Sequence, residues 1–399
     1  LGRVVVISAG NEGDGNIHQR ISLNANEKKS FKIKIEKNQS NNSASLFSFL
    51  SFNKGDNETS PITLKITAPN GSEFIQNPGS NSTNFLKDTA GKNYQQITSY
   101  NYVDSDSGKR FIQIIATRLT TANTEGVYDL EIENNSTKNI TVDGWLTSTN
   151  YNLAKISFPE GDNNYTVGSP GSADEAITVA NYVGNVAFAV NSSTPSANGT
   201  YSSSGIMTEN LNSSSSKGPR ADEARKPDIA SGGTFVISAK TKDNVDPYII
   251  DGKYYSQMTG TSMASPAVAG SVALLLQANN RLTAKQVKQR LIENTNKDSY
   301  TTGNYTNEFG YGKLNIYKAV SSELNNLNNN TSCPVSINYT LANDNLAYKW
   351  GFASQTNPVN NGTNLVNFSP SNIAVKLKSS ATGKIGNVTF LLGNYNSNT

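Results

Sequence analysis

A serine stands at the start of a run of small residues that is typical of a tightly packed helix. Ser262 is the third residue of the segment 260–270, which reads Gly-Thr-Ser-Met-Ala-Ser-Pro-Ala-Val-Ala-Gly. In the first turn of a helix the backbone N–H groups lack intrahelical partners, and the helix dipole favours negative charge. These conditions suit the oxyanion of a tetrahedral acyl intermediate, with the serine hydroxyl as nucleophile. For such a run taken alone, a serine that merely caps a packed helix is the favoured interpretation.

A distant asparagine supplies the second group that this chemistry needs. Asn11 lies in the turn Gly10–Gly13, directly after the β-branched run Val4–Ile7. An Asn side chain at the carboxyl end of a buried strand can donate its amide N–H to the same oxyanion. By itself Asn11 is also an ordinary turn residue. The pair, each member in the strand or helix context that its task requires, predicts an acyl-transfer site.

The segments around these two residues have the sequence pattern of an α/β domain, with short buried strands and helices. The run 3–7 predicts a parallel strand buried on both faces, and we expect the strands that cover it to come from earlier sequence. Further short strands are predicted at 176–179, 226–229 and 235–238. Residues 262–279 predict a helix. Thr283 is expected to cap a second helix, whose apolar face carries Val287, Leu291 and Ile292. The predicted fold is therefore a parallel sheet flanked by helices, incomplete at its amino-terminal side.

Between Asn11 and Ser262 the sequence changes to short segments in which hydrophobic and polar residues alternate, without helical periodicity. Strands are predicted at 31–36, 62–68, 111–117, 127–133 and 140–146, with turn sequences such as Pro69-Asn70-Gly71 between them. We interpret 17–158 as an inserted antiparallel β-sandwich or jelly roll. After a polar linker at 323–330, residues 331–399 predict a further β module, complete or not.

Composition excludes several classes of function. The chain has 399 residues, of which 35% are hydrophobic and 16% charged, and its formal net charge is +3. This charge argues against a nucleic-acid partner, and the longest apolar stretch, 267–276, predicts no membrane span. The single cysteine, Cys333, excludes an intramolecular disulfide framework and a cysteine-rich zinc site, and the single histidine, His18, excludes any site that needs two histidines.

Five segments in a fixed order resemble the subtilase (subtilisin-like) serine protease family, and they cover residues 1–16 and about 159–322. They are Ala9–Gly13, Thr166–Pro170 with Ile177–Val179, Ser215–Pro219 with Lys226–Ala230, Gly260–Gly270 and Gly310–Asn315. The resemblance implies a serine endopeptidase that cleaves protein or peptide substrates through an acyl-enzyme on Ser262. It implies an oxyanion hole made by Asn11 and the Ser262 backbone N–H, and a specificity pocket lined by Ala9, Gly10 and Gly168. The position and texture of the insert resemble those of clostridial germination proteases.

The departures from the family pattern concern the base. The family places its aspartate and histidine segments before the asparagine segment, and this sequence has neither there. His18 follows the asparagine, lacks the family's surroundings, and is interpreted as a loop histidine at the entry of the insert. We therefore expect this chain alone to be inactive and to need the missing amino-terminal part of the same protease. The alternative is a non-catalytic pseudoprotease or an extracellular binding module, against which the intact Ser262 and Asn11 argue.

The chemistry implied by the resemblance requires no cofactor. Calcium often stabilises this family, but no acidic loop here has a convincing ligand spacing, and Asp104-Ser105-Asp106 is better interpreted as a solvated turn. The tyrosines and the two tryptophans, Trp145 and Trp350, are interpreted as core aromatics, which disfavours carbohydrate binding. The low charge and the Asn/Ser/Thr-rich loops predict an exported bacterial protein, extracellular or on the cell surface.

Overall fold

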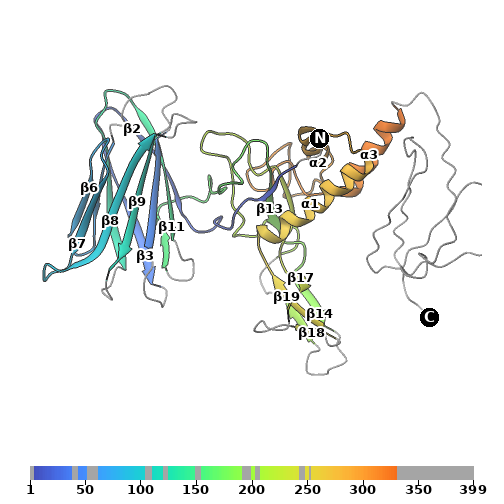
Figure 1. Ribbon diagram of the computed structural model, residues 1–399, viewed down its shortest axis with the longest axis horizontal. Helices are drawn as coiled ribbons and strands as arrows, with labels where there is room; N and C mark the ends of the chain where they lie inside the picture. Colours follow the sequence, from blue (N-terminus) through green and yellow to red (C-terminus); the bar gives the residue numbers. More distant parts are fainter. Residues whose placement is uncertain are drawn as a thin grey trace, which may run out of the picture. The chain divides into compact units, whose positions relative to one another are not determined.

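The computed structural model describes ten segments of the chain (Figure 1). They are residues 4–37, 44–51, 62–103, 110–119, 125–148, 154–190, 199–202, 207–241, 248–250 and 253–329. The chain divides into two compact units, Leu1–Ala319 and Val320–Thr399. The predicted module at 331–399, including Trp350, lies outside the described residues.

A three-stranded parallel sheet forms the centre of the α/β part. Its strands are β1 (Val6–Ser8), β13 (Ile177–Tyr182) and β16 (Ile229–Gly232), in the order β1-β13-β16. The middle strand is almost entirely buried, as its apolar sequence predicts. Strand β1 pairs with β13 on one side only, so it is half-buried, and the preceding Val5 is 59% exposed. The prediction that strands from earlier sequence complete the burial of this strand therefore stays a prediction.

Two helices with clear start signals lie in the same part. Helix α1 (Thr261–Ala278) packs against all three strands, and it begins after Gly260 and ends at Asn279 (Figure 1). Helix α2 (Ala284–Glu293) has the predicted cap, because Thr283 and Gln286 form a reciprocal capping box. By length and composition α1 could cross a membrane, which corrects the prediction that no segment qualifies. One side of α1 packs against the three strands, while residues such as Leu274 on the rest of the helix are exposed.

A third helix corrects the predicted linker. Helix α3 (Ile316–Asn329) continues through most of 323–330. Asparagines are weak helix formers. However, Val320, Leu324 and Leu327 extend an apolar stripe at helical spacing, and this periodicity is the stronger signal.

The insert is a sandwich of two antiparallel sheets that enclose the largest hydrophobic core of the described residues. One sheet has the strand order β12-β3-β10-β5-β6 and the other the order β2-β11-β4-β9-β8-β7. In chain order the strands are β2 (His18–Leu23), β3 (Lys28–Lys37), β4 (Ala44–Ser51), β5 (Ile62–Thr67), β6 (Glu73–Gln76), β7 (Ser82–Lys87), β8 (Asn93–Val103), β9 (Arg110–Arg118), β10 (Gly126–Asn134), β11 (Ile140–Ser148) and β12 (Ala154–Ser157).

The five strands predicted in this region correspond to β3, β5, β9, β10 and β11. The others are short or, like β8, rich in Asn, Gln, Ser and Thr, so their hydrophobic alternation is weak. The description of the sandwich as a jelly roll stays a prediction.

The remaining strands belong to two small antiparallel sheets. Strand β14 (Ala187–Val190) pairs with β15 (Gly199–Ser202). Strand β19 (Lys253–Met258) pairs with β17 (Val236–Ala239) and β18 (Tyr248–Ile250). Strand β19 leads directly into Gly260 and helix α1, so it delivers the chain to Ser262.

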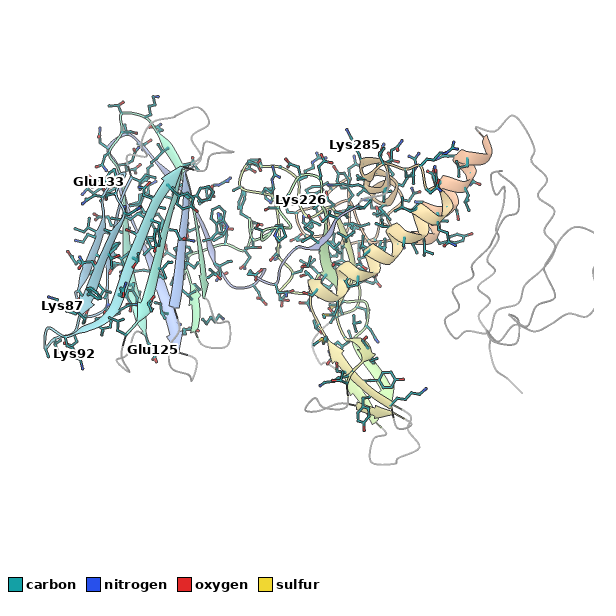
Figure 2. The ribbon with its side chains drawn as sticks, in the orientation of Figure 1. Lys87, Lys92, Glu125, Glu133, Lys226 and Lys285 are labelled. Carbon is teal, nitrogen blue, oxygen red and sulfur yellow. The ribbon has the colours of Figure 1, made fainter. Side chains whose placement is uncertain are left out.

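The strand predicted at 226–229 begins only at Ile229, with β16, and residues 226–228 are buried but belong to no strand. Lys226, labelled in Figure 2, has a buried ammonium group that lies 2.9 Å from the Asp228 carboxylate. The same Nζ donates to the carbonyl of Ala176 at 2.8 Å and to Thr178 Oγ1 at 2.9 Å. Pro227 has no N–H for a ladder. The polar side chains of this segment thus anchor the sheet from its start.

Candidate active site

The turn after β1 and the start of α1 meet at the side chain of Asn11. The backbone N–H of Thr261 donates to Asn11 Oδ1 at 3.0 Å, and the Thr261 hydroxyl donates to the same oxygen at 3.1 Å. Only the oxygen of a carboxamide can accept a hydrogen bond from a backbone N–H, so these bonds determine which end of the carboxamide faces Thr261. Asn11 Nδ2 is therefore turned away from Thr261. It makes no hydrogen bond with any described residue.

The first turn of α1 leaves one of its N–H groups free. The Thr261 N–H is bound to Asn11, and the N–H groups of Met263 and Ala264 reach the Gly260 carbonyl at 3.0 and 3.3 Å. The N–H of Ser262 has no partner among the described residues. Ser262 is also exposed, whereas Thr261 is fully buried. One free backbone donor and a free hydroxyl thus sit side by side at the positive end of the helix dipole.

Gly260 lies next to the Asn11 carboxamide. A Cβ at this position would be in ordinary van der Waals contact, 3.4 Å from Asn11 Oδ1 and 3.5 Å from Asn11 Nδ2. The preference for glycine here therefore comes from its φ of +158°, which L side chains rarely adopt, and not from a steric clash.

The predicted pocket residues lie beside this point. The Gly168 N–H donates to the Ala9 carbonyl at 3.0 Å, which joins the segment before β13 to the turn after β1. Gly168 is exposed and has no atom within 4 Å of the place of a Cβ. Ala9 is fully buried, so its side chain cannot face a substrate and only its backbone borders this region. Gly10 carries φ +112°, and a Cβ there would lie 2.5 Å from Glu12 Oε2 and 2.7 Å from Ser216 Oγ.

His18 is not a loop residue, and this corrects the interpretation made from sequence. It begins β2 and is fully buried. Its Nε2 lies 2.9 Å from Asp143 Oδ1, and its Nδ1 lies 3.0 Å from Asp162 Oδ1. The ring also contacts those of Trp145 and Tyr165, at centroid distances of 5.2 and 4.8 Å. With both nitrogens occupied by carboxylates, His18 cannot accept a proton from Ser262.

The surroundings of His18 favour its charged form. Burial opposes the positive charge, but hydrogen bonds and attraction from Asp143 and Asp162 outweigh it and raise the pKa of the imidazole above its ordinary 6.5. Arg20 reaches the same Asp143 at 2.7 Å and also pairs with Glu223 of the α/β part. These groups form a charged junction between the sandwich and the α/β part.

Sequence reasoning predicted Asn11 and Ser262 as site residues, which stays a prediction, and it missed Thr261, which is hydrogen-bonded to Asn11. Its only local signal was its position next to the serine, because the contact with Asn11 joins segments that lie far apart in the sequence. Within the described ranges no three Asp, Glu, His or Cys side chains are grouped so that they could hold a metal ion. Asp104 to Asp106 lie outside these ranges.

Comparisons with known proteins agree with this fold. The model of the subtilase family matches residues 134–312, which include Ser262 and Gly168 but not Asn11. The serine protease AprX of Bacillus subtilis is 32% identical over 167 residues, which are 41% of this chain and 34% of AprX. An uncharacterized protein of Aquifex aeolicus is 34% identical over 143 residues, 35% of this chain and 59% of that protein.

A solved structure extends the likeness to most of the chain. The CspB protease of Clostridium perfringens superposes with a TM-score of 0.58 at 18% identity, over 81% of this chain and 60% of that one. The α/β part therefore has the subtilisin-like fold. Residues 134–312 are similar to the subtilase family, and the relatives named here, AprX and CspB, are proteases. The chain spans only part of the length of each of these relatives.

Proposed function

We propose that this chain is the part of a subtilisin-type serine endopeptidase that carries the nucleophile and the oxyanion hole. The observation that carries the proposal is that Thr261, the residue before Ser262, is hydrogen-bonded to Asn11, while three groups of these two segments have no partner among the described residues. These are the hydroxyl and the backbone N–H of Ser262 and the Nδ2 of Asn11, whose Oδ1 accepts from Thr261. Preorganised donors of this kind stabilise charge that develops on the substrate carbonyl.

The reaction proceeds in two acyl-transfer steps. Ser262 Oγ attacks the peptide carbonyl carbon while its proton passes to a general base, and the carbonyl oxygen becomes an oxyanion held by Asn11 Nδ2 and the Ser262 N–H. Collapse of this intermediate breaks the C–N bond, and the base returns the proton to the leaving amine. Water then attacks the acyl-enzyme in the same manner, which releases the acid and restores Ser262.

The general base and the aspartate that orients it are proposed to come from another part of the same protease. His18 is excluded by its burial and its two carboxylate partners. The proposed segment would lie near the first turn of α1, where Ser262 is exposed, and near the edge of β1 that pairs with no strand in the described part of the chain. The chain alone should then turn nothing over, because its serine has no base to accept the hydroxyl proton.

Secretion is part of the proposal. It is supported by the weakly charged, Asn-rich composition and by the relation to a protease of Bacillus subtilis that is named as extracellular, Vpr, which is 35% identical over 113 residues. A non-catalytic role for the α/β part has no observation in its favour.

Active-site labelling tests the proposal. The complete gene product that contains these residues is treated with a fluorophosphonate probe, and the labelled residue is found by peptide mass spectrometry. We expect labelling of Ser262 alone, its loss in Ser262→Ala, and its retention in Ser265→Ala, a control one helical turn away. The chain 1–399 by itself should label at least a hundredfold more slowly than the complete product, on the order expected when a catalytic base is lost. Labelling at another residue, or none in a folded complete product, would overturn the assignment.

A further inference from the structure

The two outer faces of the sandwich differ in chemistry. The face formed by β3, β10 and β5 carries cross-strand ion pairs, such as Lys28 with Glu133 at 3.1 Å and Lys65 with Glu73 at 2.7 Å. Glu133 and its neighbours are drawn in Figure 2. Lysines and carboxylates on a solvent-facing sheet keep it soluble and need no ligand to explain them.

The outer face of β7, β8 and β9 has an uncharged central part. This part comprises positions 83 and 85 on β7, the even positions 96–102 on β8, and the odd positions 111–117 on β9, where the intervening residues face the core. These positions hold Thr, Phe, Gln, Tyr and Ile. At the end of β7, after a register shift, the exposed Lys87 borders this part. We name the uncharged part the aromatic face.

Three large aromatic side chains are exposed on the aromatic face. Tyr100 is 42%, Tyr102 is 46% and Phe85 is 39% exposed. Tyr102 also lies parallel to Phe111 of the neighbouring strand, at a centroid distance of 5.5 Å and an interplanar angle of 11°. The prediction that the tyrosines are core aromatics is therefore wrong for this group. Exposed aromatic rings gathered on one face of a sheet indicate a contact surface.

Neutral hydrogen-bonding groups lie between the rings. Gln96 Nε2 and Thr83 Oγ1 both donate to Thr98 Oγ1, each at 3.3 Å, and Gln113 pairs with Tyr100 across the ladder. The tyrosine hydroxyls add donors and acceptors at the ring edges. The aromatic face thus combines flat apolar rings with amides and hydroxyls, and Lys87 lies only at its margin.

The aromatic face belongs to a sheet that already makes a contact between parts of the molecule. At the opposite edge of the same sheet, strands β2 and β11 carry His18, Arg20 and Trp145. The Trp145 indole N–H donates to the Tyr165 carbonyl at 2.8 Å. A ligand held on β7–β9 would therefore occupy the sheet that also bonds the insert to the α/β part.

We propose that the aromatic face binds a neutral oligosaccharide. A pyranose ring has an apolar C–H face that stacks on an aromatic ring, and a rim of hydroxyls that pair with amide and hydroxyl groups; the face supplies both kinds of partner. Sulfated or phosphorylated glycans would require Lys or Arg at these positions, which are occupied by uncharged residues. A polypeptide is the less suitable ligand, because interface anchors of proteins fill pockets, whereas these rings stand exposed on a sheet surface. The proposal does not depend on proteolysis by Ser262.

Calorimetric titration of the whole chain tests the proposal. The probes are cellohexaose, chitohexaose and mannohexaose, with heparin as a charged comparison. At least one neutral hexasaccharide should bind, and Tyr100→Ala and Tyr102→Ala should each weaken its binding about tenfold, because each removes one stacking ring. Tyr317→Ala, which removes an 80% exposed ring elsewhere, and Val127→Ala on the charged face should leave the affinity unchanged.

Folding of each variant is checked by its thermal unfolding, which should remain a single cooperative transition because Tyr100 and Tyr102 lie outside the core. The proposal is overturned if no neutral hexasaccharide binds the folded chain, if heparin binds more tightly than all of them, or if both tyrosine variants bind normally. Retention of carboxymethylated casein that depends on Tyr100 and Tyr102, without saccharide binding, would also overturn it and would identify a protein-docking surface.

Discussion

The carboxamide of Asn11 is oriented by Thr261, whose backbone N–H and hydroxyl both donate to Asn11 Oδ1, at 3.0 and 3.1 Å. The residue next to the proposed nucleophile thus holds the proposed oxyanion donor. Because the two contacts occupy only the oxygen, the Nδ2 group remains available. This relationship has direct consequences for catalysis.

Removal of the Asn11 donor should lower turnover with little effect on substrate binding. In the complete protease, Asn11→Ala should reduce kcat by about a hundred- to a thousandfold, the range known from removing one such donor in a subtilisin, with KM nearly unchanged. Asn11→Asp should lose at least as much, since it keeps an acceptor for Thr261 but places negative charge beside the oxyanion. Asn164→Ala, at an exposed position, is the control. A change confined to KM would contradict the assigned role.

Loss of the Thr261 hydroxyl should affect the same step indirectly. Thr261→Val removes one of the two bonds to Asn11 Oδ1 while keeping the shape, and kcat should fall about tenfold, as expected for about 1.4 kcal/mol of lost orientation. Thr261→Ser keeps the hydroxyl and should restore most of the activity. Equal activity of the two variants would show that the hydroxyl does not orient Asn11.

The stability of the insert junction should depend on the protonation of His18. Its pKa in the folded chain is raised above the ordinary 6.5, so the charged form is favoured by folding. The resulting stabilisation is fully present below about pH 6.5 and is lost as the pH rises through the raised pKa. His18→Gln should flatten the free energy of unfolding over this window.

Nuclear magnetic resonance gives an independent measure, since His18 is the one histidine of the sequence and its ring signals need no assignment. The imidazole should titrate above 6.5, and Asp162→Asn should shift the titration to lower pH. A midpoint below 6.5 in the unaltered chain would refute the charged junction.

The buried ion pair before β16 should contribute strongly to stability. Asp228→Ala leaves the ammonium of Lys226 buried without its anion, and the free energy of unfolding in urea should fall by about 3–5 kcal/mol. Asp129→Ala removes the partner of Lys32 on the exposed face of the sandwich and should leave the free energy almost unchanged. Similar losses in the two variants would contradict the role of burial.

The sequence by itself determined the parts of this protein that depend on neighbouring residues. A helix opening at Ser262, the cap at Thr283, the glycine turn that holds Asn11, and the strongly alternating strands of the insert all follow from local propensity and periodicity. The subtilase likeness rests on such short segments, and the family match and the fold of the α/β part confirm it.

Only the tertiary structure decided what those parts do to one another. It brought Thr261 into hydrogen bonds with the Asn11 carboxamide and placed His18 between two aspartates. It also left β1 half-buried and exposed Tyr100 and Tyr102 on one face. Each of these outcomes is a contact, or the lack of one, between residues far apart in the chain. Such contacts depend on how whole elements pack, and no pattern of adjacent residues specifies that packing.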